Sequence, residues 1–69
     1  MIEKTIKKGN TIYYIYKENG VYKLTTKQNF DAYVMDANKI TKFDGFTSAN
    51  QIIDYMKKYN TYFGEFAIL

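Results

Sequence analysis

Asn19-Gly20 is the dipeptide that most restricts what this 69-residue chain can fold into. Asn and Gly both accept the positive φ angles that the centre of a type I′ turn requires. The dipeptide separates two runs rich in β-branched and aromatic residues, Thr11–Lys17 and Val21–Thr25. This pattern predicts a β-hairpin. A weaker turn signal at Gly9-Asn10 joins the hairpin to a strand predicted at Ile2–Lys8, which makes a three-stranded antiparallel meander.

Two-residue loops fix the register of this meander and therefore its faces. They place Ile15 opposite Leu24, Tyr13 opposite Thr26, and Ile6 opposite Tyr13. The face predicted to line the core carries Ile2, Ile6, Tyr13, Ile15, Tyr22 and Leu24, with Lys4 and Lys17 near its margin. The other face carries Glu3, Thr5, Lys7, Ile12, Tyr14, Tyr16, Lys23, Thr25 and Lys27.

Residues 28–46 fit two patterns. Phe30, Tyr33, Val34 and Ala37 match a short helical stripe, whereas Ala32–Met35 and Ile40–Phe43 match a second hairpin around residues 36–39. The hairpin is favoured because Val, Tyr, Ile, Thr and Phe prefer strands and no helix cap is evident before Phe30.

A helix is predicted from about Ser48 to Tyr59. Ser48 and Gln51 have the spacing of a capping box. Ile52, Ile53, Met56 and Tyr59 form an apolar stripe, and Asp54 has the spacing to pair with Lys58.

In the tail, Tyr62–Leu69, both the odd-numbered and the even-numbered positions are apolar apart from Glu65. A strand with two apolar faces is covered on both sides, so this pattern predicts a last strand inserted in the sheet or buried against a second copy. The sequence thus predicts one α+β domain over residues 1–69. We expect an antiparallel meander sheet of about five or six short strands with one helix, about 48–59, across one face, followed by a last strand.

Composition favours binding over catalysis. The chain has no His, Cys or Arg, but eight Tyr and five Phe. It therefore lacks the commonest general base, the commonest metal ligand and the strongest side-chain nucleophile. We expect no enzyme activity, no catalytic residue, no metal site and no cofactor. Without Cys or His, neither a disulfide nor a structural zinc ion can reinforce so small a domain. Oligomerisation or a tightly filled aromatic core remain, and the thirteen aromatic residues favour the core.

The acidic residues do not form a recognisable cation site. The run from Asp36 begins like a calcium loop, but Ile40, Thr41 and Thr47 stand at the positions of an oxygen ligand, the turn glycine and the bidentate Glu. We therefore assign Asp36 and Asp44 to turns and caps.

The predicted outer sheet face interleaves tyrosines with lysines and is the first candidate binding site. Lys7, Tyr14, Tyr16, Lys23 and Lys27 would let a partner stack on rings and pair with ammonium groups. The alternative is that these residues are simply the wet side of an antiparallel sheet. A second candidate is self-association through Phe63, Phe66 and Ile68 of the last strand.

These features support three functional hypotheses. The first is a non-enzymatic module of the adaptor or inhibitor type that binds a protein partner through the Tyr/Lys face or the C-terminal strand. The second is a sequence-tolerant nucleic-acid binder, which the net charge of +3 permits but the absence of Arg disfavours. The third is a self-associating accessory protein, for instance a homodimer through the last strand.

No signal peptide or membrane span is evident, so we expect a cytoplasmic protein that does not enter a membrane. The bias toward Lys, Ile, Asn and Tyr resembles that of short accessory proteins of mobile genetic elements. This resemblance is one of composition and not of family.

Overall fold

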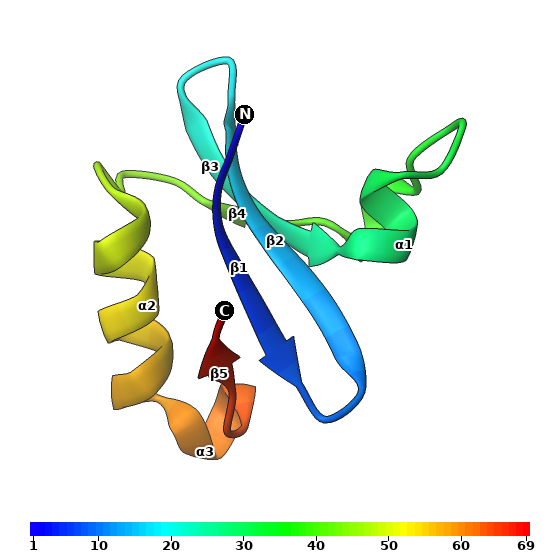
Figure 1. The fold of residues 1–69 in the computed structure, drawn as a ribbon. Helices are drawn as coiled ribbons and strands as arrows, with labels where there is room; N and C mark the ends of the chain where they lie inside the picture. The colour runs from blue at the N-terminus through cyan, green and yellow to red at the C-terminus, as the bar shows by residue number, and fades with distance from the viewer.

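The computed structural model describes residues 1–69, which form a five-stranded antiparallel sheet with helices on both faces (Figure 1). The strands lie in the order β4-β3-β2-β1-β5. They are β1 (Ile2–Lys8), β2 (Thr11–Glu18), β3 (Val21–Thr26), β4 (Thr41–Phe43) and β5 (Ala67–Ile68). The helices are α1 (Lys27–Phe30), the 3₁₀ turn η1 (Ala37–Lys39), α2 (Ala49–Lys58) and α3 (Asn60–Phe63). The predicted α+β class, with one helix longer than two turns, is confirmed.

The meander formed by β1, β2 and β3 has the predicted register. Ile15 pairs with Leu24, and Tyr13 pairs with both Thr26 and Ile6. Asn19 and Gly20 have φ angles of +52° and +79°, as a type I′ turn requires at both central positions. The turn chemistry therefore sets which side chains of the meander face the core.

One part of the face assignment is wrong, at the start of β1. A bulge between Ile2 and Lys4 places Ile2 opposite Tyr16, so Ile2 lies on the outer face and not on the core side. The Glu3 carboxylate accepts hydrogen bonds from the Tyr22 hydroxyl at 2.9 and 3.0 Å. A bulge adds one residue to a strand and so reverses the alternation beyond it.

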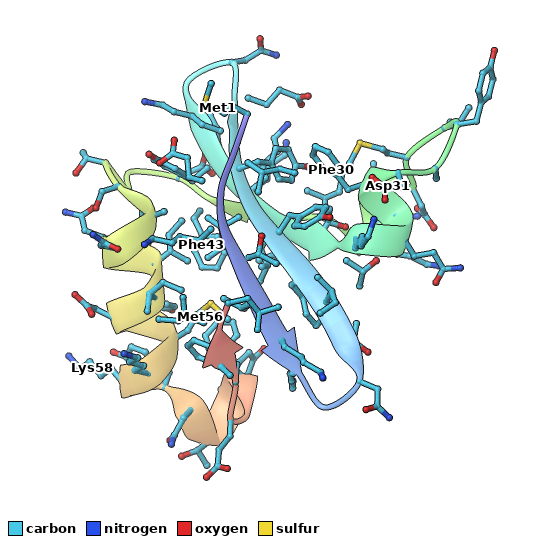
Figure 2. The ribbon with its side chains drawn as sticks, viewed as in Figure 1. Met1, Phe30, Asp31, Phe43, Met56 and Lys58 are labelled. Atoms are coloured by element: carbon cyan, nitrogen blue, oxygen red, sulfur yellow. The ribbon has the colours of Figure 1, made fainter.

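The core lies between α2 and the sheet, as predicted (Figure 2). Ser48 caps α2, because its Oγ accepts from the Gln51 N–H at 3.2 Å. The Gln51 side chain accepts from the Thr47 N–H, one residue before the position that a capping box uses. The buried hydrophobic cluster is Ile6, Ile15, Tyr22, Leu24, Phe43, Ala49, Ile52, Ile53 and Met56. Each fully buried aliphatic or aromatic side chain here contributes about 1.5–3 kcal/mol.

Two details of the predicted helix differ in the structure. Tyr59 is 44% exposed and ends α2, so it does not belong to the buried stripe. Asp54 and Lys58 form no ion pair; the ion pairs of the chain are Lys23–Glu18 and Lys27–Asp31.

The hairpin predicted at 32–35 and 40–43 is wrong in its first half. Residues 32–35 form no strand, and β4 at Thr41–Phe43 pairs with β3 instead. The chain enters α1 directly from β3 because the Thr26 hydroxyl accepts from the Asn29 N–H at 3.1 Å. Thr26 is thus the helix cap that sequence reasoning did not identify.

Asn29 fixes the path of the chain after α1. Its amide donates to Thr25 Oγ1 at 2.9 Å and to the Asp36 carbonyl at 3.1 Å, and its Oδ1 accepts from the Asp36 N–H at 2.9 Å. These bonds close the base of the loop at residues 31–36, which projects from the sheet in Figure 1. Tyr33 and Val34 at its tip are fully and largely exposed.

The tail differs from the expected covered strand. Its first part is the helical turn α3, and only Ala67 and Ile68 form β5, which pairs with Lys7 and Ile6 at the edge of β1. Both β5 residues are exposed. Gly64, with φ of +83° and ψ of 172°, makes the turn between α3 and β5, a conformation open almost only to glycine.

Candidate functional site

The predicted Tyr/Lys face is partly covered by α1. The ring of Phe30 packs edge-on against Tyr14, with centroids 5.3 Å apart, and against Tyr16, with centroids 5.0 Å apart. Tyr16 is only 3% exposed, so it is not part of an accessible surface. Burial raises its pKa above the usual tyrosine value. Tyr14 is half-buried and remains at the margin of this face.

The lysines of the same face mostly have acidic partners. Lys23 Nζ lies 2.7 Å from Glu18, and Lys27 Nζ lies 2.5 Å from Asp31. Hydrogen bonding to these carboxylates raises the pKa of both lysines, and the bond from Lys23 lowers the pKa of Glu18. Lys7 is exposed and takes part in no ion pair. The structure thus places the five predicted residues on one face but leaves a less cationic and less aromatic surface than the sequence pattern indicates.

The residues predicted for self-association do not form one exposed surface. Phe63 and Phe66 pack against the core of their own chain. Ile68 is 46% exposed at the edge of the sheet and is the one member of the set with a large accessible surface.

A different aromatic surface runs along the outer side of α2 and α3. Three tyrosines form it, and we call Tyr55, Tyr59 and Tyr62 the aromatic row. They are 39%, 44% and 86% exposed. Tyr55 and Tyr59 are one helical turn apart, with ring centroids 4.8 Å apart.

Phenylalanines support the aromatic row from behind. The rings of Phe46 and Phe63 lie 5.5 and 5.7 Å from that of Tyr55, and Phe63 also lies 5.3 Å from Tyr62. Phe43, in the core, contacts both Phe46 and Tyr55. A continuous set of rings therefore joins the exposed tyrosines, through Tyr55 and Phe63, to the buried core.

Sequence reasoning missed the aromatic row because it assigned Tyr59 to the buried stripe and Tyr62 to a strand. The backbone of Tyr59, with φ of −109° and ψ of 39°, interrupts the helix and starts α3 immediately afterwards. The signal in the sequence was the spacing of Tyr55 and Tyr59, followed by two adjacent aromatic residues, Tyr62 and Phe63.

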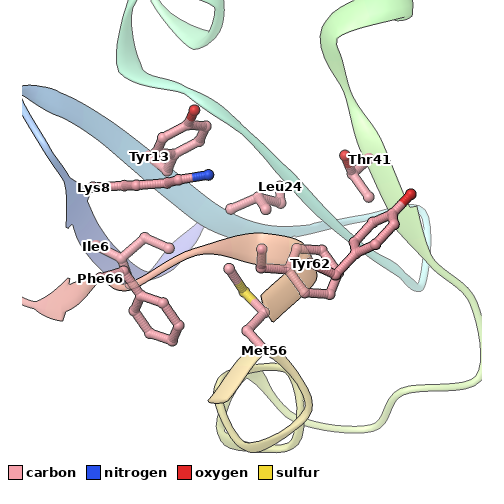
Figure 3. Close-up of a pocket in the computed structure, with 9 residues that line it drawn as sticks. Ile6, Lys8, Tyr13, Leu24, Thr41, Met56, Tyr62 and Phe66 are labelled. Carbon is pink, nitrogen blue, oxygen red and sulfur yellow. The ribbon is translucent and has the colours of Figure 1, made fainter. Parts of the chain in front are cut away.

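A cavity of about 190 Å³ lies beside the aromatic row, between the sheet and the tail (Figure 3). We call it the tail cavity. Its apolar walls are Ile6, Leu24, Met56, Phe63 and Phe66. Its polar lining comes from Lys8, Tyr13, Thr41 and Tyr62. No carboxylate lines it.

The acidic residues do not gather into a metal site, since no three carboxylates of the chain lie together. Asp36 caps η1 by accepting from the Asn38 N–H at 3.0 Å, and Asp44 lies in the turn after β4, as predicted for both. No helix of the chain combines the length and the apolar character needed to cross a bilayer.

Comparisons with protein-family models, with curated proteins and with solved structures gave no match to this chain. Its function must therefore be argued from the surfaces described above.

Proposed function

We propose that this chain is a non-enzymatic binding module that recognises a protein partner through the aromatic row. The observation that carries this proposal is that three exposed tyrosines belong to one continuous set of ring contacts, which the partly buried Phe46 and Phe63 join to the core. Tyrosine contributes large contact area at low entropic cost and is enriched among the residues that dominate binding energy at protein interfaces. A domain of this size forms such a flat contact more readily than a deep substrate pocket.

The charges beside the row suit a protein better than a nucleic acid. Lys57 and Lys58 lie at the end of α2, but Asp54 is on the same helix and Asp44 lies near its start. Lys58 Nζ lies 5.6 Å from the centroid of the Tyr59 ring, which makes a cation–π contact within the chain. Nucleic-acid binding depends on many uncompensated cations. On the Tyr/Lys face, which was the predicted nucleic-acid surface, Lys23 and Lys27 are already paired with acids.

The test is capture of partners from an extract of the source cell, followed by mass spectrometry, with Tyr59→Ala/Tyr62→Ala as the variant. We expect the unaltered chain to enrich a small set of proteins that nuclease treatment does not remove. The double variant should lose them, with affinity reduced at least about tenfold, because each tyrosine would be an anchor. Moderate salt should change the capture little.

The matched control is Tyr33→Ala, which removes an exposed tyrosine from the loop at residues 31–36 on another part of the molecule. It should capture the same proteins as the unaltered chain. Equal capture by the double variant would show that the aromatic row is not the contact surface. Loss of all captured proteins on nuclease treatment would favour the nucleic-acid hypothesis.

A further inference from the structure

The tail cavity is an apolar space with one cationic group in its lining. Phe63 and Phe66 come from the two sides of the turn at Gly64, and both pack against the core from the tail. Ile6 and Leu24 come from the sheet and Met56 from α2. The apolar walls therefore come from β1, β3, α2 and the tail, so the packing of the whole domain forms the cavity.

The size of the cavity limits what it can hold. An apolar cavity of about 150 Å³ in another protein stays dry and binds benzene. At about 190 Å³, the tail cavity can hold one aromatic ring with one or two further carbons, or a hydrocarbon chain of similar volume.

Lys8 sets the charge that a ligand should carry. Figure 3 shows its side chain running across the cavity between Tyr13 and Ile6, with the amine directed toward Leu24. The end of this exposed side chain lies close to Gly64: a Cβ on that glycine would lie 2.8 Å from Lys8 Cε and 3.2 Å from Nζ. Lys8 is in neither ion pair of the chain, and no acid lines the cavity. Its ammonium group is therefore available to an anion.

Other lining groups add hydrogen-bond donors but no further charge. Thr41 and Tyr62 also line the cavity, and Figure 3 shows their hydroxyls on the far side of Leu24 from the Lys8 amine. A hydroxyl can donate to a carboxylate oxygen. A single ammonium with no arginine beside it matches a singly charged carboxylate better than a phosphate, which binds most strongly to several donors.

We propose that the tail cavity binds a small apolar monocarboxylate, with its ring or chain inside the cavity and its carboxylate paired with Lys8. 3-Phenylpropanoate and hexanoate have this chemistry. This binding site is separate from the proposed protein contact, although Tyr62 borders both.

The test is an NMR titration of the isotope-labelled chain with 3-phenylpropanoate. We expect saturable shifts at the methyl groups of Leu24 and Met56 in the millimolar range or below. The neutral alcohol 3-phenylpropanol and the cation 3-phenylpropylamine have the same ring and linker. They should bind at least about tenfold more weakly, because neither provides a carboxylate for Lys8.

Lys8→Met is the matching variant, since methionine keeps much of the apolar stem and removes the ammonium group. It should weaken 3-phenylpropanoate binding at least about tenfold and leave the alcohol nearly unaffected. The control is Lys7→Met, the neighbouring residue of β1, whose side chain lies on the opposite face of the sheet. Absence of saturable shifts, equal binding of acid and amine, or unchanged acid binding by a folded Lys8→Met variant would each overturn the proposal.

Discussion

At the scale of single residues, the Asn29 side chain joins the end of β3 to the far end of the loop at residues 31–36. Asn29 is 7% exposed, and its side chain makes three hydrogen bonds, two of them to the backbone of Asp36. Thr25, its second partner, is also buried and donates from its hydroxyl to the Lys39 carbonyl at 2.9 Å. The Asn29 amide and the Thr25 hydroxyl therefore fix the path of residues 31–39, where the predicted hairpin would have used strand pairing.

We predict that Asn29→Ala lowers the free energy of unfolding by about 1–3 kcal/mol, since it leaves buried polar groups without partners. Chemical denaturation measures this change. Hydrogen exchange at the Asp36 amide should also accelerate, because that N–H loses its acceptor. Gln28→Ala, a change at the exposed neighbour, is the control and should stay within about 0.5 kcal/mol of the unaltered chain. A similarly small effect of Asn29→Ala would show that Asn29 does not hold the loop.

The elements differ in how far the sequence predicts them. β2, β3 and α2 are encoded locally: Asn19-Gly20 supplies the turn geometry, and Ser48 supplies the cap that starts the helix. These elements were predicted to within one or two residues. α1 was missed because Thr26 ends a strand and caps a helix at once, and only the Asn29 contacts make the second role evident.

The tail was mispredicted for a similar reason. Its residues have high strand propensity, but the break at Tyr59 and the conformation of Gly64 are set by packing on the core. The bulge between Ile2 and Lys4 likewise has no local sequence signal, since neither a Gly nor a turn dipeptide marks it.

Gly64→Ala tests the connection between α3 and β5. The φ of +83° disfavours any side chain, and the new Cβ would meet Lys8. We predict a loss of about 1–3 kcal/mol in stability and faster hydrogen exchange at the Leu69 amide, whose bond to the Thr5 carbonyl is 2.9 Å. Gly9→Asn is the control, because Asn tolerates the φ of +60° found there. Unchanged exchange at Leu69 would indicate that β5 docks independently of this turn.

Across the whole molecule, the alternation of side chains along β1, β2 and β3 assigned residues to the correct sheet face from Lys4 onward. The alternation could not show which other elements cover each face. Tyr14 and Tyr16 lie opposite the core as predicted, yet Phe30 covers them because α1 folds back onto β2. The aromatic row could be identified only once the helix was known to end at Tyr59. Candidate binding residues were therefore located less well than the strands that carry them.

Both faces contain a buried tyrosine, and this predicts how global stability responds to alkali. Burial raises the pKa of Tyr16, and the hydrogen bond to Glu3 raises that of Tyr22. A raised pKa means that the folded chain holds its proton more tightly than the unfolded chain. The stabilisation is complete below the unfolded value of about 10 and is lost as pH rises through the folded value.

We therefore predict that the free energy of unfolding falls between about pH 9 and about pH 11, and that Tyr16→Phe/Tyr22→Phe falls less steeply. Urea denaturation across this range measures the slope. Lys23 and Lys27, whose pKa values are also raised, lose stabilising charge in the same range, so the free energy of unfolding of the variant still falls with pH, only less steeply. Tyr33→Phe, at an exposed site, should leave the slope unchanged. Equal slopes for all three chains would contradict the assignment.

The short pairing of β5 with β1 has a consequence for how the sheet is completed. β1, β2 and β3 can assemble from neighbouring segments, whereas β5 must return from the far end of the sequence to cover β1. Until it does so, the backbone of β1 is an open template for another strand. Two copies that meet at this stage can exchange their tails, each β5 docking on the other copy's β1. Concentrated refolding should therefore yield interlocked dimers that dilute refolding does not.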